Sequence, residues 1–204
     1  MSAAFSQASR ASSEASILGQ AEFEGAQFEG KADFHTFQAG DFVFFRPDTK
    51  GRPVRFLGNV SFFHAHIHGQ LEFDGAQLMQ ESLFEGLEVD GNAYFRRDKL
   101  HTQISFGGTA NFFNASIHGD VDFIGAEFCG ETNFENMKVG GNAYFRGDTS
   151  NNTVLFEKKA DFTGAHFQSE AQFYGVRFVG PAISISPKVG AYSCRTTLRR
   201  EVWT

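Results

Sequence analysis

The chain has 204 residues, with 26 Phe and 22 Gly against four Pro and one Trp, and a formal net charge of −6. An acidic body precedes a basic end, since residues 1–180 carry 14 basic and 23 acidic side chains and residues 181–204 carry four and one. This distribution lacks the basic stripe of a nucleic-acid-binding protein, and no run approaches the ~20 apolar residues of a membrane-spanning helix. The spacing of Cys129 and Cys194 does not indicate a disulfide. We therefore expect two free thiols and a reducing, cytoplasmic location.

The first segment, residues 1–16, is rich in Ala and Ser and precedes any repeat. It has neither the basic start nor the apolar stretch of a secretory signal. We expect an N-terminal cap or a disordered segment here.

Residues 17–180 contain a long internal repeat. The segment SFFHAHIHGQLEFDGAQL at 61–78 matches NFFNASIHGDVDFIGAEF at 111–128 and DFTGAHFQSEAQFYGVRF at 161–178, without a gap. Within each unit, large apolar residues recur at alternating steps of five and six, usually with a small residue two positions before. Apolar residues at every second position of such short segments predict strands with one inward face. Gly at the ends of the segments predicts corners with positive φ.

The number of strands in one coil follows from these apolar centres. If four strands make a coil, every fourth centre stacks on the one before, and all four columns are apolar. The first is Phe34, Phe62, Phe84, Phe112, Phe134 and Phe162; the second is Ile17, Ala39, Ile67, Val89, Ile117, Val139 and Phe167; the third is Phe23, Phe45, Phe73, Phe95, Phe123, Phe145 and Phe173; and the fourth is Phe28, Phe56, Leu78, Phe106, Phe128, Phe156 and Phe178. A three-sided coil would turn Lys50, Leu100 and Ser150 inward, and Lys and Ser are poor core residues.

Loops are expected on alternate coils, between Arg46 and Arg55, Arg96 and Ser105, and Arg146 and Leu155, so that a shorter coil alternates with a longer one. Each loop starts with Phe-Arg-x-Asp, which gives the pairs Arg46/Asp48, Arg96/Asp98 and Arg146/Asp148. Arg and Asp could simply tie down the base of each loop. Alternatively, a strip of matched loops on a rigid rod forms an interaction surface.

A possible metal-binding patch follows from stacking the second column. The alternation HAHIH at 64–68 predicts three outward imidazoles on one strand. His66 and His68 flank the inward Ile67, and the next two coils place Glu88, Asp90 and His118 beside them. Imidazole and carboxylate groups together are competent zinc ligands. A solvated ladder of weak ion pairs is the simpler interpretation, so we expect no metal and no cofactor, with this patch as the one alternative.

Tandem Ala-x-Phe-x-Gly units such as AEFEG (21–25) and AQFEG (26–30) resemble the pentapeptide-repeat proteins. The resemblance covers about residues 15 to 180 and extends to variant repeats in larger bacterial members. It implies a right-handed, four-sided parallel β-helix, here of about seven coils. Some members of that family resemble duplex DNA in width and charge, and bind topoisomerases such as gyrase.

The last segment, residues 181–204, leaves the repeat at Pro181. A C-terminal cap, a dimerisation segment and a non-repeat tail all remain open, and a homodimer could form through an end cap.

The functional expectation is a non-catalytic structural or protein-interaction module with a rigid acidic surface, acting on an unidentified protein rather than on nucleic acid. The acidic residues Glu22, Glu72 and Asp122 occupy outward positions and are expected to form a surface ladder rather than a cleft. Because convergent catalytic groups and known catalytic motifs are missing from the sequence, an enzyme is not expected. A DNA-mimicking binder of gyrase and a polysaccharide-acting β-helix enzyme are the alternatives.

Overall fold

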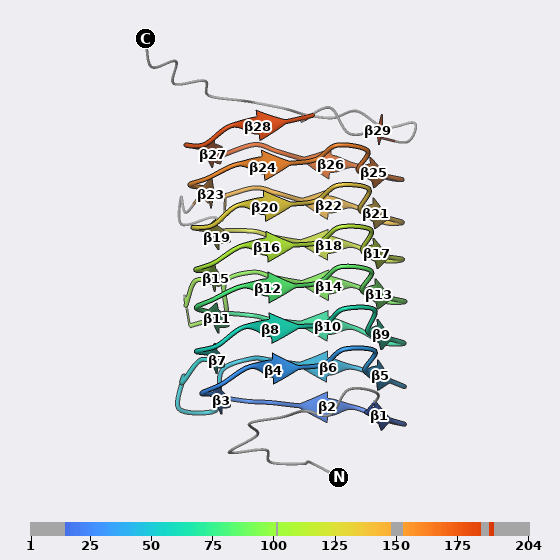
Figure 1. Ribbon diagram of the computed structural model, residues 1–204, viewed down its shortest axis with the longest axis vertical. Helices are drawn as coiled ribbons and strands as arrows, with labels where there is room; N and C mark the ends of the chain where they lie inside the picture. The colour runs from blue at the N-terminus through green and yellow to red at the C-terminus, as the bar shows by residue number, and fades with distance from the viewer. Residues whose placement is uncertain (1–14, 101, 148–152, 185–187, 190–204) are drawn as a thin grey trace.

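The computed structural model describes residues 15–100, 102–147, 153–184 and 188–189. Within these ranges the chain winds into a stack of coils, and Figure 1 shows the strands of each coil lying directly above those of the coil before. All strand pairs in these ranges are parallel, and they form four sheets, one with eight strands and three with seven. The predicted four-sided parallel β-helix of about seven coils is therefore confirmed, while the right-handed winding stays a prediction.

The four sheets, named here A to D, each take every fourth strand. Sheet A contains β1 (Ser16–Ile17), β5 (Gln38–Ala39), β9 (His66–Ile67), β13 (Glu88–Val89), β17 (Ser116–Ile117), β21 (Lys138–Val139), β25 (His166–Phe167) and β29 (Lys188–Val189). Sheet B contains β2 (Ala21–Glu22), β6 (Val43–Phe44), β10 (Leu71–Glu72), β14 (Ala93–Tyr94), β18 (Val121–Asp122), β22 (Ala143–Tyr144) and β26 (Ala171–Gln172). Sheet C contains β3 (Gln27–Phe28), β7 (Arg55–Phe56), β11 (Gln77–Leu78), β15 (Ser105–Phe106), β19 (Glu127–Phe128), β23 (Val154–Phe156) and β27 (Val176–Phe178). Sheet D contains β4 (Ala32–Asp33), β8 (Val60–Ser61), β12 (Ser82–Leu83), β16 (Ala110–Asn111), β20 (Thr132–Asn133), β24 (Ala160–Asp161) and β28 (Ala182–Ile183).

The strand register reproduces the predicted alternation of coil length. Asn92 and Asp120 directly precede the paired strands β14 and β18 and are 28 positions apart, which is the length of one coil. Asp120 and Asn142 directly precede the paired strands β18 and β22 and are 22 positions apart, which is the length of the next coil. The longer coils contain the loops, which join sheet B to sheet C and project from the left side of the stack in Figure 1. Four sheets also rule out the three-sided coil.

The interior consists of stacked phenylalanine rings. Phe123 lies between Phe95 and Phe145 in its column, with ring centroids 5.1 and 4.9 Å away and the planes within 16° of parallel. It meets Phe112 of the first column edge-on, with the centroids 5.4 Å apart. Both arrangements are favourable for aromatic quadrupoles. The residue two positions before each apolar centre also points inward, as the full burial of Ala126 and Leu71 shows, so each side of a coil contributes two side chains to the core.

Two kinds of corner close each coil. Between sheets B and C, Gly25, Gly75 and their equivalents take φ between 61° and 68°, as the sequence predicts for glycine. Between sheets D and A the same left-handed conformation falls mostly on non-glycine residues, including Thr36, His64 and Asn114. His64 therefore lies at a corner before β9 and does not join the outward row of His66 and His68 that the sequence suggested.

The remaining corners depend on glycine for a different reason, namely the close approach of successive coils. A Cβ atom at Gly130 would clash with the backbone carbonyl group of Gly108, one coil below. Because strands in adjacent coils lie only about 4.8 Å apart, a side chain at such a corner has no space.

The paired strands continue beyond residue 180, where the sequence analysis ended the repeat. β28 pairs with β24, and β29 pairs with β25. Residues 1–14, 185–187 and 190–204 lie outside the described residues, and with them most of both predicted end segments. In the ranges that the structure describes, no helix is long and apolar enough to cross a membrane.

Candidate functional site

The outward face of sheet B carries an ordered array of charged and aromatic side chains. Along this face, an acidic residue on one coil alternates with an aromatic residue or arginine on the next. One row reads Glu22, Phe44, Glu72, Tyr94, Asp122 and Tyr144, and the neighbouring row reads Glu24, Arg46, Asp74, Arg96, Ile124 and Arg146. The alternation arises because the sequence repeats every second coil, so even and odd coils present different side chains.

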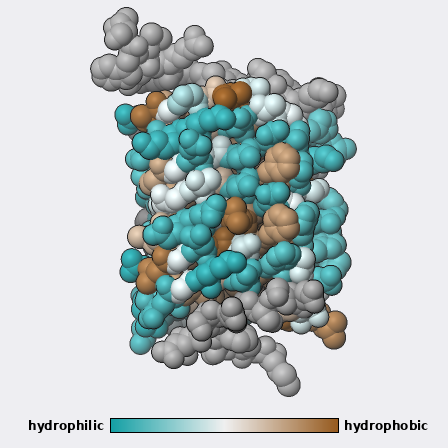
Figure 2. Space-filling view, viewed as in Figure 1, coloured by the Kyte–Doolittle hydropathy of each residue, from teal (hydrophilic) through white to brown (hydrophobic). Residues whose placement is uncertain are grey.

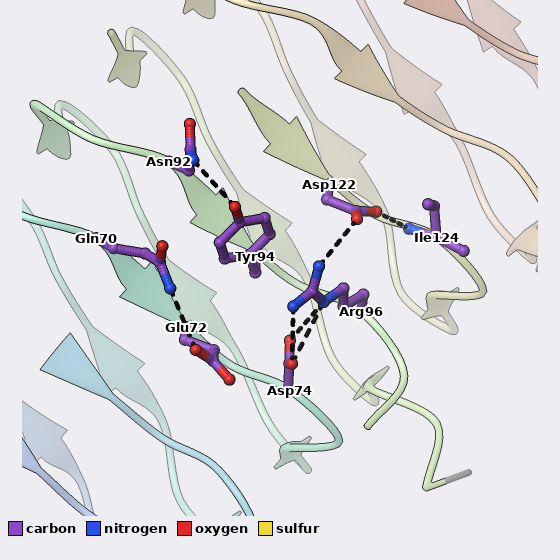
Figure 3. A network of polar contacts seen from close by, with 8 residues as sticks. All are labelled: Gln70, Glu72, Asp74, Asn92, Tyr94, Arg96, Asp122 and Ile124. Carbon is purple, nitrogen blue, oxygen red and sulfur yellow. Dashed lines mark hydrogen bonds and ion pairs between the residues drawn. The ribbon is translucent and has the colours of Figure 1, made fainter. Parts of the chain in front are cut away.

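Arg96 is the centre of the polar network on this face, shown in Figure 3. Its Nε donates to Oδ1 of Asp74 over 3.1 Å, and its Nη1 lies 3.5 Å from Oδ2 of Asp122. The guanidinium also lies over the ring of Tyr94, 4.1 Å from the centroid. Oδ1 of Asp122 accepts a 2.7 Å hydrogen bond from the backbone N–H of Ile124. One cation thus bridges carboxylates of the coils on either side.

Both carboxylates are buried, which corrects the expectation of a surface position for Asp122, whereas Glu22 and Glu72 of the predicted ladder are partly exposed. Asp74 is only 7% exposed and Asp122 only 6%. Arg96 contacts both carboxylates, and Tyr94 on the intervening coil lies in register between Glu72 and Asp122. Figure 2 shows polar and apolar side chains interleaved on one face of the stack. The acidic column is therefore a partly covered network rather than a row of separate surface charges.

Burial changes the titration of these carboxyl groups. Desolvation, followed by the neighbouring charge of Glu72, raises the pKa of Asp74 to about 8, although Arg96 acts in the opposite direction. Desolvation also raises the pKa of Asp122 above its usual value, against the lowering effects of the Ile124 amide and Arg96. Near neutral pH, Asp74 consequently retains a proton.

A groove, here called the loop groove, lies beside this network between two loops. Its volume is about 270 Å³, and it is lined by Arg46, Pro47, Asp48, Glu72, Asp74, Asp98, Lys99 and Leu100. The two loops meet at their tips, since a Cβ atom on Gly51 would lie 3.0 Å from Cδ1 of Leu100. Leu100 is nevertheless 64% exposed, so an apolar side chain stands at the rim of an acidic groove.

The loop aspartates hold the loop bases, as one of the two interpretations of the Phe-Arg-x-Asp motif predicts. Oδ1 of Asp48 accepts 2.9 Å hydrogen bonds from the N–H groups of Lys50 and Arg52. Oδ1 of Asp98 accepts a 2.6 Å hydrogen bond from the N–H of Thr102. The second oxygen of Asp98, Oδ2, is buried and has no hydrogen-bond partner.

The arginines of the motif differ in their contacts. Arg46 donates from Nε to Glu24 over 2.9 Å and lies over the Phe44 ring, while Arg96 belongs to the buried network. Arg146 lies between 5.6 and 5.7 Å from the rings of Tyr144 and Tyr174. Asp148 lies outside the described residues.

The predicted histidine and carboxylate patch does come together on sheet A. Nε2 of His66 lies 3.1 Å from Oδ1 of Asp90, and Nδ1 of His68 lies 2.9 Å from Oδ2 of Asp90. On the next coil, His118 lies 3.3 Å from Asp90 through Nδ1 and 3.5 Å from Glu88 through Nε2. Burial alone would raise the pKa of Asp90, but hydrogen bonds from His68 and His66 hold it below its usual value.

Two groupings escaped the sequence analysis. Glu127, Cys129 and Glu157 converge on sheet C, with one ligand atom each within 4.8 Å of the others. Burial, together with these two carboxylates, raises the pKa of the Cys129 thiol and keeps it protonated. The loop groove is the second grouping. Its only signal in the sequence was that the coil between two Arg-x-Asp loops carries acidic residues at the equivalent positions.

Comparisons with protein-family models, with curated proteins and with solved structures found no match to this chain.

Proposed function

We propose that this chain is a pentapeptide-repeat protein that acts as a non-catalytic module and binds another protein through the loop groove. The four-sided fold, the Phe columns and the Ala-x-Phe-x-Gly units support the family. A rigid stack of coils suits recognition, because the loops lose little conformational freedom when a partner binds.

The observation that carries the proposal is the unpartnered carboxylate oxygen of Asp98 at an acidic groove with an exposed apolar rim. A buried oxygen without a hydrogen-bond donor is costly to maintain, and a donor supplied by a partner would satisfy it once the loop at Asp98 shifts to admit that donor. Asp48, Glu72, Asp74 and Asp98 outnumber the basic lining residues Arg46 and Lys99. We therefore infer that the groove receives a Lys or Arg side chain, while Leu100 contacts apolar surface beside it.

The size of the groove favours a side chain over a free metabolite. Pockets for drug-sized ligands generally enclose about 300–1,000 Å³, so a volume of about 270 Å³ lies below that range. One long side chain of a partner, with the loop tips packing around it, fits this volume.

The alternation of charge on sheet B weighs against mimicry of DNA. A mimic needs a continuous negative stripe, whereas Arg46 and Arg96 interrupt the acidic row on alternate coils. We expect no inhibition of gyrase supercoiling at micromolar concentrations of the protein. Inhibition under those conditions would favour the mimicry alternative instead.

A second function rests on one observation, the raised pKa of Asp74 beside the carboxyl group of Glu72. Paired carboxyl groups with separated pKa values are the usual acid and base of glycoside cleavage. The alternative is a polysaccharide-acting enzyme, and its test is the release of reducing ends or unsaturated products from acidic polysaccharides. Activity that disappears in Asp74→Asn would establish it over the binding function.

The test of the binding function uses a photo-crosslinking residue in place of Leu100, in cells of the source organism. The control carries the same residue in place of Leu18, which is 98% exposed and lies directly after β1 in sheet A. We expect one partner protein to crosslink from position 100 and not from position 18. Glu72→Lys should abolish that crosslink, while Glu131→Lys, which makes the same charge change near sheet D, should leave it intact. Equal crosslinking from both positions would overturn the assignment.

A further inference from the structure

We propose that the sheet A patch binds one divalent transition-metal ion of the zinc class through His66, His68 and Asp90. This site is independent of the loop groove, because it lies on a different sheet. The three residues each offer one ligand atom, and these atoms all lie within 4.8 Å of one another. Imidazole nitrogen together with carboxylate oxygen is a common ligand set for zinc.

The strands hold the three side chains in place before any ion arrives. His66 and His68 flank the buried Ile67 on β9, so both imidazoles point outward from the same short strand. Asp90 follows β13 on the next coil, and its backbone N–H donates to the carbonyl of Ile67 over 2.9 Å. The N–H of His68 donates to Ala39 over 2.9 Å on the other side. Ligands fixed by hydrogen-bonded strands need little reordering on binding.

The spacing fits a tetrahedral ion. Zn–N and Zn–O bonds of about 2.0–2.1 Å place neighbouring ligand atoms roughly 3.3 Å apart. The observed separations are 3.1 Å from His66 to Oδ1 of Asp90 and 2.9 Å from His68 to Oδ2, so a rotation of the carboxylate is needed to bring one oxygen beside both nitrogens. The centroids of the two imidazole rings lie 4.1 Å apart, with the planes inclined at 45°, and each ring turns one nitrogen toward the carboxylate of Asp90.

A second set, formed by Glu88, Asp90 and His118, competes for the same aspartate. It contains one imidazole instead of two, and both nitrogens of His118 already lie against carboxylates. Since nitrogen-rich sites are preferred by zinc and its neighbours, the set with His66 and His68 is assigned as the ligand set.

A plain ladder of ion pairs is the alternative that the experiment must separate. His66, His68 and Asp90 have side chains between 31% and 50% exposed, and exposed ion pairs contribute little on their own. A ladder has no need for metal, and its histidines would be individually replaceable without a metal-dependent effect.

The test is isothermal titration of the full chain, freed of metal, with zinc chloride, together with the visible spectrum after addition of Co²⁺. We expect one ion per chain and the absorption of tetrahedral cobalt. His68→Ala, His66→Ala and Asp90→Asn should each weaken binding by more than about tenfold, since even outer-shell changes cost about 10–100-fold.

Three variants serve as controls. His166→Ala lies on the same sheet, His118→Ala removes the rival set, and Cys129→Ser removes the sheet C cluster; all three should bind as the unchanged protein does. Absence of heat and of a cobalt spectrum in the unchanged protein would overturn the site. Loss of binding in His118→Ala with retention in His66→Ala would overturn the assigned ligands.

Discussion

Arg96 donates from Nε to Oδ1 of Asp74 over 3.1 Å, although the two residues are 22 positions apart in the chain. The contact joins successive coils on the outside of sheet B, where side chains of a β-solenoid are usually solvated. It shows that this protein is held together by outward contacts as well as by its Phe columns.

Replacement of Arg96 by Ala should destabilise the fold. It would remove the cation between the buried carboxyl groups of Asp74 and Asp122, and breaking a buried pair costs about 3–5 kcal/mol. We expect the lower end, about 3 kcal/mol, because Arg96 itself is partly exposed and Asp74 retains a proton near neutral pH. Arg46→Ala is the matched control, since its partner Glu24 is 37% exposed, and it should cost below about 1 kcal/mol. Chemical denaturation of both variants measures the difference, and equal losses would contradict the role of burial.

Loss of one phenylalanine from the middle of the stack should be more costly still. Phe123→Ala removes a ring that is 0% exposed, and a cavity of that kind costs about 3–5 kcal/mol. Phe178→Ala removes a ring at the last rung of its column, where the side chain is only partly buried, and it should cost clearly less. Thermal and denaturant unfolding check both values. A loss below about 1 kcal/mol for Phe123→Ala would argue against the stacked core.

The close approach of the coils predicts opposite effects for two glycines in one column. Gly130→Ala would force a Cβ into the backbone of the coil below and should destabilise by about 1–3 kcal/mol, as overpacking does. Gly30→Ala has nothing within 4 Å of the new Cβ and should be neutral, or stabilising by up to about 1 kcal/mol through the unfolded state. Melting temperatures of the two variants give the comparison, which fails if they shift in the same direction by the same amount.

The raised pKa of Asp74 predicts how stability depends on pH. Its pKa is about 8 in the folded protein and 3.8 as the usual value, so the folded state binds the extra proton between these limits. The contribution of this carboxyl group to stability is therefore fully present below about pH 4 and is lost as the pH rises to about 8.

Asp74→Asn should remove that dependence. The difference in unfolding free energy between variant and unchanged protein should move in favour of the variant by up to about 1.4 kcal/mol per pH unit between about pH 5 and 8. The control is Asp33→Asn, because the hydrogen bond from Lys31 lowers the pKa of Asp33 and moves its titration below this window. Denaturation at four pH values measures the unfolding free energies of the variant and the unchanged protein. If both free energies changed with pH in the same way, a proton on Asp74 between these pH values would be excluded.

The periodicity of the chain was enough to predict the core. Apart from the loops, each apolar centre, such as Phe123, follows the previous one after five or six residues, and a solenoid converts that regular spacing into stacked contacts. The same register predicted that His68, Asp90 and His118 lie side by side, since they differ by whole coils.

The outward faces could not be predicted as well, because they depend on side-chain packing rather than on register. Asp122 looked solvated, yet neighbouring side chains cover it. His64 looked like a strand residue, but the five-residue step places it at a corner with φ of 52°. The loop groove depends on the conformations of two loops that interrupt the repeat, and periodicity carries no information about them.

The alternation of shorter and longer coils makes the pair of coils, and not the single coil, the modular unit of this protein. Removing or adding one such pair preserves every column and the alternation of coils, whereas removing a single coil would place two coils of the same kind in contact. A chain lengthened by such units would gain one loop per unit, roughly 10 Å further along the rod. The length of the rod therefore determines the number of loops that it presents. Duplication of a pair of coils would add one binding loop without a change in the fold.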